Sequence, residues 1–135
     1  IFDIVMFTLS LHHVPVKNMH LAIDEAIRVV THSGYIIFLE PTEEGSFFEA
    51  EIKFDACDGD ERVNKRAAYK AIYEHPKLEL VKELIDETIF TFDSIDDFIS
   101  AMKPKEHIAE IDSFLNKQNL TLHAKRRITI CRPIG

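Results

Sequence analysis

Apolar side chains recur along the first 41 residues with the periods of a strand, a helix and a second strand. Residues 1–11, IFDIVMFTLSL, form a nearly continuous apolar run, which is typical of a strand buried on both faces. Residues 16–32 have the apolar spacing of an amphipathic helix, and Gly34 follows where a left-handed C-cap favours glycine. Residues 35–39, YIIFL, predict a second buried strand. The pattern therefore predicts two parallel strands, at about 1–9 and 35–40, joined by one helix.

The rest of the chain predicts further helices and two longer strands. Helical spacing covers residues 43–57, 60–73, 94–102 and 105–118, and Ser94 with Asp97 is a capping-box signature. Alternating apolar and polar residues predict an antiparallel strand pair at about 80–92 and 120–132, and hence an α/β fold. The side chains expected to face the core are Phe47, Ala50, Phe54 and Cys57; Val63, Ala67 and Ala71; Ile108, Ile111 and Leu115; and Leu120, Leu122, Ala124, Ile128 and Ile130.

Length, charge and cysteine content narrow the class of protein. The 135 residues suffice for one ordinary domain, and no apolar run reaches the ~20 residues of a membrane-spanning helix. The formal net charge of −7 disfavours general nucleic-acid binding, and the basic run at 125–127 is interpreted as a solvated strand face. Cys57 and Cys131 stand far apart without a CxxC motif, which disfavours a zinc site or a disulfide framework. We expect a soluble, cytoplasmic domain.

Short motifs in the first 41 residues resemble the second half of class I S-adenosylmethionine-dependent methyltransferases. They are FD at 2–3, LHH at 11–13, E-x-x-R-V at 25–29, the glycine at 34 and EP at 40–41. The resemblance implies a Rossmann-like partial sheet with helices on both faces, to which this chain contributes the fourth to seventh strands. It also implies a transferase that uses S-adenosyl-L-methionine to methylate a small molecule.

Two features of that family have no counterpart in the sequence. They are the glycine-rich turn after the family's first strand and the acidic residue that binds the ribose of the cofactor. The chain also opens at Ile1, inside an apolar run. We therefore expect residues 1–135 to be a single domain, the C-terminal half of a methyltransferase domain without its N-terminal cofactor-binding strands. Such a fragment is expected to be inactive alone.

The loops after the two parallel strands hold the candidate catalytic and cofactor-binding residues, because ligands of open α/β sheets bind beyond the carboxyl ends of the strands. By resemblance, the backbone of Thr8, Leu9 and Ser10 flanks the cofactor, and His12 and His13 face its methyl group or the acceptor. An imidazole is a suitable base at neutral pH, although His12 alternatively shapes the loop. Adjacent residues on an extended segment point opposite ways, so we expect only one histidine to face the substrate. No third ligand stands at helical spacing, so we expect no metal.

The candidate substrate-binding residues are Glu40, Phe47 and Phe48. Glu40 either accepts a hydrogen bond from the acceptor or solvates the end of the strand. Phe47 and Phe48, together with Phe54, form either a hydrophobic lid over the acceptor or plain core. The acceptor itself stays open, since sugars, quinones, amines and carboxylates all fit the sequence.

Two further interpretations do not require catalysis of methyl transfer. In one, the chain is a non-catalytic α/β interaction module that pairs or dimerises through its exposed first strand, whose unpaired backbone forms an adhesive edge. In the other, the motif matches are chance and the chain is a nucleotide-binding domain of another doubly wound family.

Overall fold

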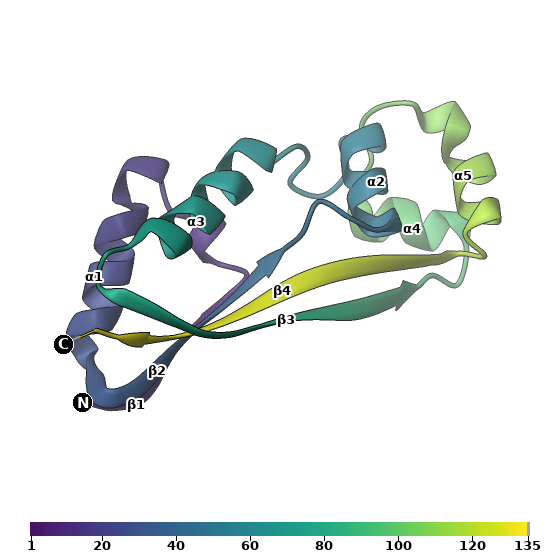
Figure 1. Cartoon of the computed structure of the whole chain (residues 1–135). Coiled ribbons are helices and arrows are strands. Elements are labelled where there is room, and N and C mark those ends of the chain that lie inside the picture. Colours follow the sequence, from purple (N-terminus) through teal and green to yellow (C-terminus); the bar gives the residue numbers. More distant parts are fainter. Residues whose placement is uncertain (135) are drawn as a thin grey trace. The chain divides into compact units, whose positions relative to one another are not determined.

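A computed structural model describes residues 1–134 of the chain (Figure 1). The strands are β1 (Phe2–Thr8), β2 (Val30–Pro41), β3 (Leu78–Thr91) and β4 (Thr121–Pro133), and they form a sheet in the order β1-β2-β4-β3. The helices are α1 (Met19–Val29), α2 (Ser46–Phe54), α3 (Arg62–Glu74), α4 (Ile95–Met102) and α5 (Ile111–Lys117), with 3₁₀ turns η1 (Leu11–His13), η2 (Val16–Asn18) and η3 (Ile108–Glu110). No helix in residues 1–134 has both the length and the apolar composition that crossing a bilayer requires.

The described residues divide into two compact units. Unit 1 comprises residues 1–41, 62–86 and 126–134, and unit 2 comprises residues 42–61 and 87–125. The long strands β3 and β4 contribute residues to both units.

In unit 1, β1 and β2 are neighbouring parallel strands, as the sequence predicts. Val5 lies opposite Ile36, and Phe7 lies opposite Phe38. The rings of Phe7 and Phe38 stack with their centroids 5.0 Å apart. The predicted strand–helix–strand unit at the start of the chain is therefore confirmed.

The junction between α1 and β2 differs from the prediction. α1 ends at Val29, and β2 begins at Val30 in an extended conformation, five residues before the predicted start at Tyr35. Gly34 consequently lies inside β2, and the prediction that it caps the helix is wrong. A Cβ atom at Gly34 would lie 2.6 Å from the backbone oxygen of Asp3 on β1. Glycine is required here because two backbones approach closely.

The helices α1 and α3 share one core on the same face of these strands (Figure 1). The residues of α3 that are buried are Lys65, Ala68 and Ile72, whereas Val63 is 78% exposed. The prediction that Val63 faces the core is therefore wrong, although Ala67 and Ala71 do pack against it. A lysine side chain can bury its aliphatic carbons along an apolar surface. Because Lys65 is buried, the buried face of α3 differs from the face that the spacing of apolar residues predicts.

The opposite face of β1 and β2 carries a patch of exposed apolar side chains. Ile4 and Met6 are each 57% exposed, and Tyr35 is 37% exposed. The strand register places Ile4 beside Tyr35 and Met6 beside Ile37, so these side chains adjoin one another. The sequence predicts helices on both faces of the sheet. Within unit 1, α1 and α3 lie on one face, and the exposed apolar patch lies on the other.

The strands β3 and β4 form the predicted antiparallel pair. Near one end, the amide of Ile134 donates to the carbonyl of Lys77 at 2.9 Å, and near the other, the amide of Phe92 donates to that of Leu120 at 2.8 Å. β4 also pairs antiparallel with β2. The α/β fold class, with one parallel and further antiparallel pairings, is confirmed.

The buried face of β4 changes along its length. Leu122 and Ala124 are buried, as predicted, but in unit 1 the buried residues are Thr129 and Cys131. The prediction that Ile128 and Ile130 continue the buried face is therefore only partly met, since both are intermediate in exposure. A strictly alternating pattern assigns every second residue to the same face, so it does not predict that the buried face changes between Ala124 and Thr129.

Unit 2 has its own core, built from α2, α4, α5 and the ends of β3 and β4 that belong to it. The ring of Phe54 meets those of Phe98 and Phe114 edge-on, at centroid distances of 6.2 and 5.2 Å. The predictions that Cys57 and Ile108 face this core are wrong, because both are exposed. α2 ends at Phe54, before Cys57, and Ile108 lies in the turn η3, where helical spacing does not apply.

Candidate functional site

The carboxyl ends of β1 and β2 lie side by side in unit 1 and carry the candidate residues. The chain leaves β1 at Thr8 and bends at Leu9, whose φ of 54° is left-handed. The amide of Leu9 donates to the carbonyl of Leu39 on β2 at 2.9 Å. The amide of His13 then donates to the carbonyl of Ser10 at 3.1 Å, which closes the 3₁₀ turn η1. The loop is thus tied to the neighbouring strand end before it reaches the two histidines.

A buried pair, His12 and Glu40, joins the loop to the end of β2. The side chain of Glu40 accepts from the backbone amide of His12 at 3.1 Å and contacts the His12 ring nitrogen Nδ1 at 2.6 Å. His12 is 3% exposed and Glu40 is 4% exposed. The two contacts hold both the backbone and the ring of His12 to one carboxylate.

This pair overturns one of the interpretations made from sequence. Glu40 is buried and engaged by His12, so the interpretation of Glu40 as a solvated strand end is wrong. Because a buried carboxylate needs donors to offset its desolvation, the pairing also explains why the loop folds back on β2.

His13, in contrast, is exposed. Its ring centroid lies 4.2 Å from that of His12, and the two planes are inclined by 39°. The expectation that the two side chains point opposite ways is therefore wrong, because these residues form a 3₁₀ turn and not an extended segment. The structure brings both histidines together, one buried and one exposed.

Glu40 has a cationic neighbour on β4 that the sequence interpretation missed. Arg127 is the register partner of Glu40. Its guanidinium carbon lies 3.9 Å from the ring centroid of Tyr69 on α3, and its Nε lies 3.7 Å from a carboxylate oxygen of Glu83. Arg127 therefore does not belong to a solvated strand face. Arg127 belongs to the basic run at 125–127, but nothing in the sequence indicates its contacts with Tyr69 and Glu83.

The other predicted site residues lie in two different places. Thr8 and Ser10 are exposed at the end of β1, beside the partly buried Leu9. Phe47 and Phe48 lie on α2 in unit 2, where the ring of Phe47 packs 4.9 Å from that of Phe90. The roles expected of these five residues stay predictions.

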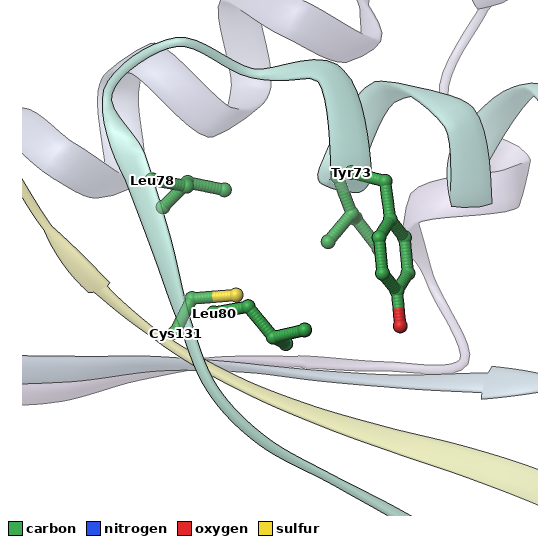
Figure 2. Close-up of a pocket in the computed structure, with 5 residues that line it drawn as sticks. Tyr73, Leu78, Leu80 and Cys131 are labelled. Carbon is green, nitrogen blue, oxygen red and sulfur yellow. The ribbon is translucent and has the colours of Figure 1, made fainter.

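A separate small cavity of about 60 Å³ lies in unit 1 between α3, β3 and β4. Figure 2 shows the thiol of Cys131 directed into it, with Leu78, Leu80 and Tyr73 around it. Burial, followed by the nearby Glu83 carboxylate, raises the pKa of the Cys131 thiol to about 11. A protonated thiol among apolar side chains offers neither a base nor a nucleophile at neutral pH, so this cavity is not the candidate site.

Comparison with known proteins places this geometry in a known fold. No family model matches the chain, and no curated protein matches it. Among solved structures, the crystal structure of a "putative methyltransferase" from Bacillus halodurans C-125 matches with a TM-score of 0.59 and 16% sequence identity. The chain has a methyltransferase-like, Rossmann-type fold.

The extent of that match also matters. It covers 99% of this chain and 65% of the Bacillus halodurans structure, so the chain spans only part of the length of its structural neighbour. At this identity the likeness concerns the fold alone.

Proposed function

We propose that the chain is the C-terminal half of an S-adenosylmethionine-dependent methyltransferase that acts on a small molecule in the cytoplasm. The observation that carries the proposal is the cluster of Glu40, His12 and His13 at the adjoining carboxyl ends of two parallel strands. Ligands of open α/β sheets bind at such ends. Histidine side chains gain and lose protons near neutral pH, so histidines at these ends favour a site for proton transfer. The fold of the chain and the motifs LHH and EP support the same conclusion.

The chemical groups of the loop after β1 fit one side of a cofactor site. Residues 8–13 offer backbone groups and the hydroxyls of Thr8 and Ser10, and they include no lysine or arginine. A segment without cations suits a positively charged sulfonium and disfavours a phosphate-bearing cofactor. When bound, S-adenosylmethionine supplies an electrophilic methyl group.

The chain's own residues orient the reactants and handle protons in this proposal. Glu40 fixes His12 through both its backbone amide and its ring, and the turn η1 fixes His13 beside it. Methyl transfer is an in-line displacement, so alignment of the acceptor provides most of the rate enhancement. In this proposal His13, which is exposed, contacts the acceptor.

The test is binding of S-adenosylhomocysteine to the complete gene product that contains this chain, measured by isothermal titration calorimetry. ATP, which has the same adenosine but carries phosphates, is the control ligand. We expect the complete product to bind S-adenosylhomocysteine at least ~10-fold more tightly than ATP, because phosphates find no cation in the loop. The 135-residue chain alone is expected to bind poorly. Equal or tighter binding of ATP would instead favour another doubly wound nucleotide-binding family.

A second candidate function follows from the exposed patch on unit 1. Phe2, Ile4 and Met6 are 56–57% exposed on β1, which stands at the end of the strand order. A long apolar edge strand is a site for pairing with another chain, so a non-catalytic module would dimerise through β1.

Light scattering on the 135-residue chain tests the module. A dimer that Met6→Lys dissociates, and that the matched surface change Leu21→Lys on α1 leaves intact, would support it. A monomer at all concentrations would reject it.

A further inference from the structure

We infer that the methyl acceptor carries a carboxylate group and that Arg127 on β4 binds this group. The inference rests on the proposed function and narrows the acceptor, which the sequence leaves open. It makes Arg127 a residue that determines specificity and gives it no part in the methyl transfer itself. The basis is an arginine with unused hydrogen-bond donors beside the candidate site.

Arg127 lies next to the end of β2, on the face of the sheet that α3 covers. It is the register partner of Glu40, and residues directly opposite each other in an antiparallel pair have their side chains on one face. The Cα atoms of such partners are about 4.5–5.5 Å apart. The guanidinium carbon of Arg127 lies 3.9 Å from the ring centroid of Tyr69 on α3. An acceptor bound at Glu40 and His12 therefore has Arg127 one strand away.

The guanidinium group of Arg127 has donors that its surroundings do not use. Its Nε is buried and has no hydrogen-bond partner in the part of the chain that the structure describes. A carboxylate oxygen of Glu83 lies 3.7 Å from Nε, beyond hydrogen-bond distance, and the other oxygen of Glu83 accepts from the hydroxyl of Thr129 at 3.3 Å. In contrast, the exposed Arg28 donates from its Nε to Glu25 at 2.9 Å. Arg127 is thus a cation whose hydrogen-bonding capacity is left for a ligand.

A ligand can reach this group. The side chain of Arg127 is 26% exposed although its Nε is buried, and its terminal NH₂ groups make no hydrogen bond to any described residue. The two NH₂ groups of a planar guanidinium match the two oxygens of a carboxylate, so we expect bidentate binding. Stacking on Tyr69 already fixes the guanidinium plane, which lowers the entropy cost of binding.

Charge separates a carboxylate from neutral groups and from phosphates. Hydrogen bonds that involve ionised partners are roughly twice as strong as neutral ones, so an arginine favours a carboxylate over an amide of the same shape. Glu40 and Glu83 stand on the strands beside β4 and repel further negative charge. A phosphate monoester carries about −1.5 to −2 charges at pH 7, so it is repelled more strongly than a singly charged carboxylate. The positive sulfonium of the donor attracts such a carboxylate.

The experiment measures binding of benzoate to the complete gene product in the presence of S-adenosylhomocysteine, by ligand-observed NMR titration. Neutral benzamide, which has the same shape, and inorganic phosphate are the control ligands. Arg127→Met is compared with the wild type and with Arg132→Met. Arg132 is a matched control on the same strand, because its Nε also lies 3.7 Å from a carboxylate oxygen, that of Glu79, and its guanidinium carbon lies 5.6 Å from the ring centroid of Tyr35.

We expect the wild type and Arg132→Met to bind benzoate at least ~10-fold more tightly than benzamide or phosphate. Arg127→Met should lose this preference, and Arg127→Lys, which keeps the charge without the planar fork, should retain only part of it. Affinity for S-adenosylhomocysteine should stay within about 3-fold of the wild type in all variants, because Arg127 contacts the acceptor and not the cofactor. Urea denaturation checks that the variants fold.

The outcomes separate this inference from the proposed function. Equal affinity of the wild type for benzoate and benzamide, tighter binding of phosphate than of benzoate, or equal losses in Arg127→Met and Arg132→Met overturns the inference and leaves the methyltransferase standing. Failure of the complete gene product to bind S-adenosylhomocysteine overturns the proposed function, and this inference with it.

Discussion

At the scale of single residues, the buried carboxylate of Glu40 orders the loop after β1. It accepts from the amide and the ring of His12, both well shielded from water. We predict that Glu40→Gln lowers the free energy of unfolding by about 1–3 kcal/mol. The NH₂ group of glutamine cannot accept a hydrogen bond, so one of the two contacts with His12 is lost.

Urea denaturation of the 135-residue chain measures this loss. The control is Glu25→Gln, which removes an exposed pair with Arg28 on α1 and should cost less than about 0.5 kcal/mol. Equal losses in the two variants would contradict a structural role for the buried pair.

A second residue-scale prediction concerns alkaline pH and Cys131. Burial raises the pKa of this thiol to about 11, whereas an unfolded cysteine has a pKa of about 8.5. The folded state therefore holds the proton more tightly, so this contribution to stability is complete below pH ~8.5 and is lost as the pH rises towards 11.

Urea midpoints between pH 8 and pH 10.5 test this dependence. Both proteins carry Cys57→Ala, since the pKa of Cys57 is also raised, mainly by burial. The protein with Cys131 should lose stability more steeply than its Cys131→Ala counterpart. Parallel slopes would show that the thiol does not titrate differently in the folded chain.

At the scale of elements, α4 is the helix whose start the sequence specifies most completely. The Ser94 hydroxyl accepts from the amide of Asp97 at 3.1 Å, and the Asp97 carboxylate accepts from the amide of Asp93 at 2.9 Å. We predict that Ser94→Ala destabilises the chain by about 1 kcal/mol, through loss of the cap. The exposed Ser100→Ala in the same helix should change the free energy of unfolding by less than about 0.5 kcal/mol. A similar urea midpoint for the two variants would argue against the cap.

Gly34 gives a prediction for the pairing of β1 and β2. A Cβ atom there would meet the Asp3 backbone oxygen at 2.6 Å and side-chain atoms of Thr31 and Val30 at 2.8 Å. Gly34→Ala should therefore cost more than about 2 kcal/mol, whereas Ser33→Ala, at an exposed neighbouring position, should be nearly neutral. Thermal unfolding of the two variants decides the matter, and an unchanged melting temperature for Gly34→Ala would contradict the close approach.

The elements also show how far sequence patterns extend. The order of elements and the parallel pairing of β1 with β2 could be predicted, because long periodic runs of apolar residues encode them. Faces and junctions could not. Lys65 is buried although it is charged, and the buried face of β4 changes from Ala124 to Thr129. Tertiary packing determines both, and single-sequence periodicity does not contain it.

At the scale of the whole molecule, the strand order predicts an uneven pattern of hydrogen exchange. β2 and β4 have neighbours on both sides, whereas β1 and β3 stand at the ends of the order among the described residues. We predict that amides of residues 36–39 and 128–131 exchange at least ~10-fold more slowly than outward amides of β1, measured by mass spectrometry at low concentration. Equal protection of β1 would mean that another strand covers it.

The sequence predicts where the candidate site lies but not which of its side chains contact one another. Parallel strands have to end beside each other, so residues 8–13 and Glu40 could be assigned to one edge from the sequence. The contact between His12 and Glu40 spans 28 positions and depends on the left-handed bend at Leu9. Leucine rarely adopts a left-handed conformation, so the residue type at position 9 does not predict the bend.

The division of β3 and β4 between the two units has a consequence for how the chain can be cut or exchanged. Unit 2 consists of two separate insertions, residues 42–61 and 87–125, between stretches that belong to unit 1. The polypeptide leaves unit 1 twice and returns twice, so no single truncation releases either unit intact. Grafting unit 2 onto a related scaffold would need both insertions transferred together, with the junctions of residues 87–125 inside β3 and β4 and those of residues 42–61 after β2 and before α3.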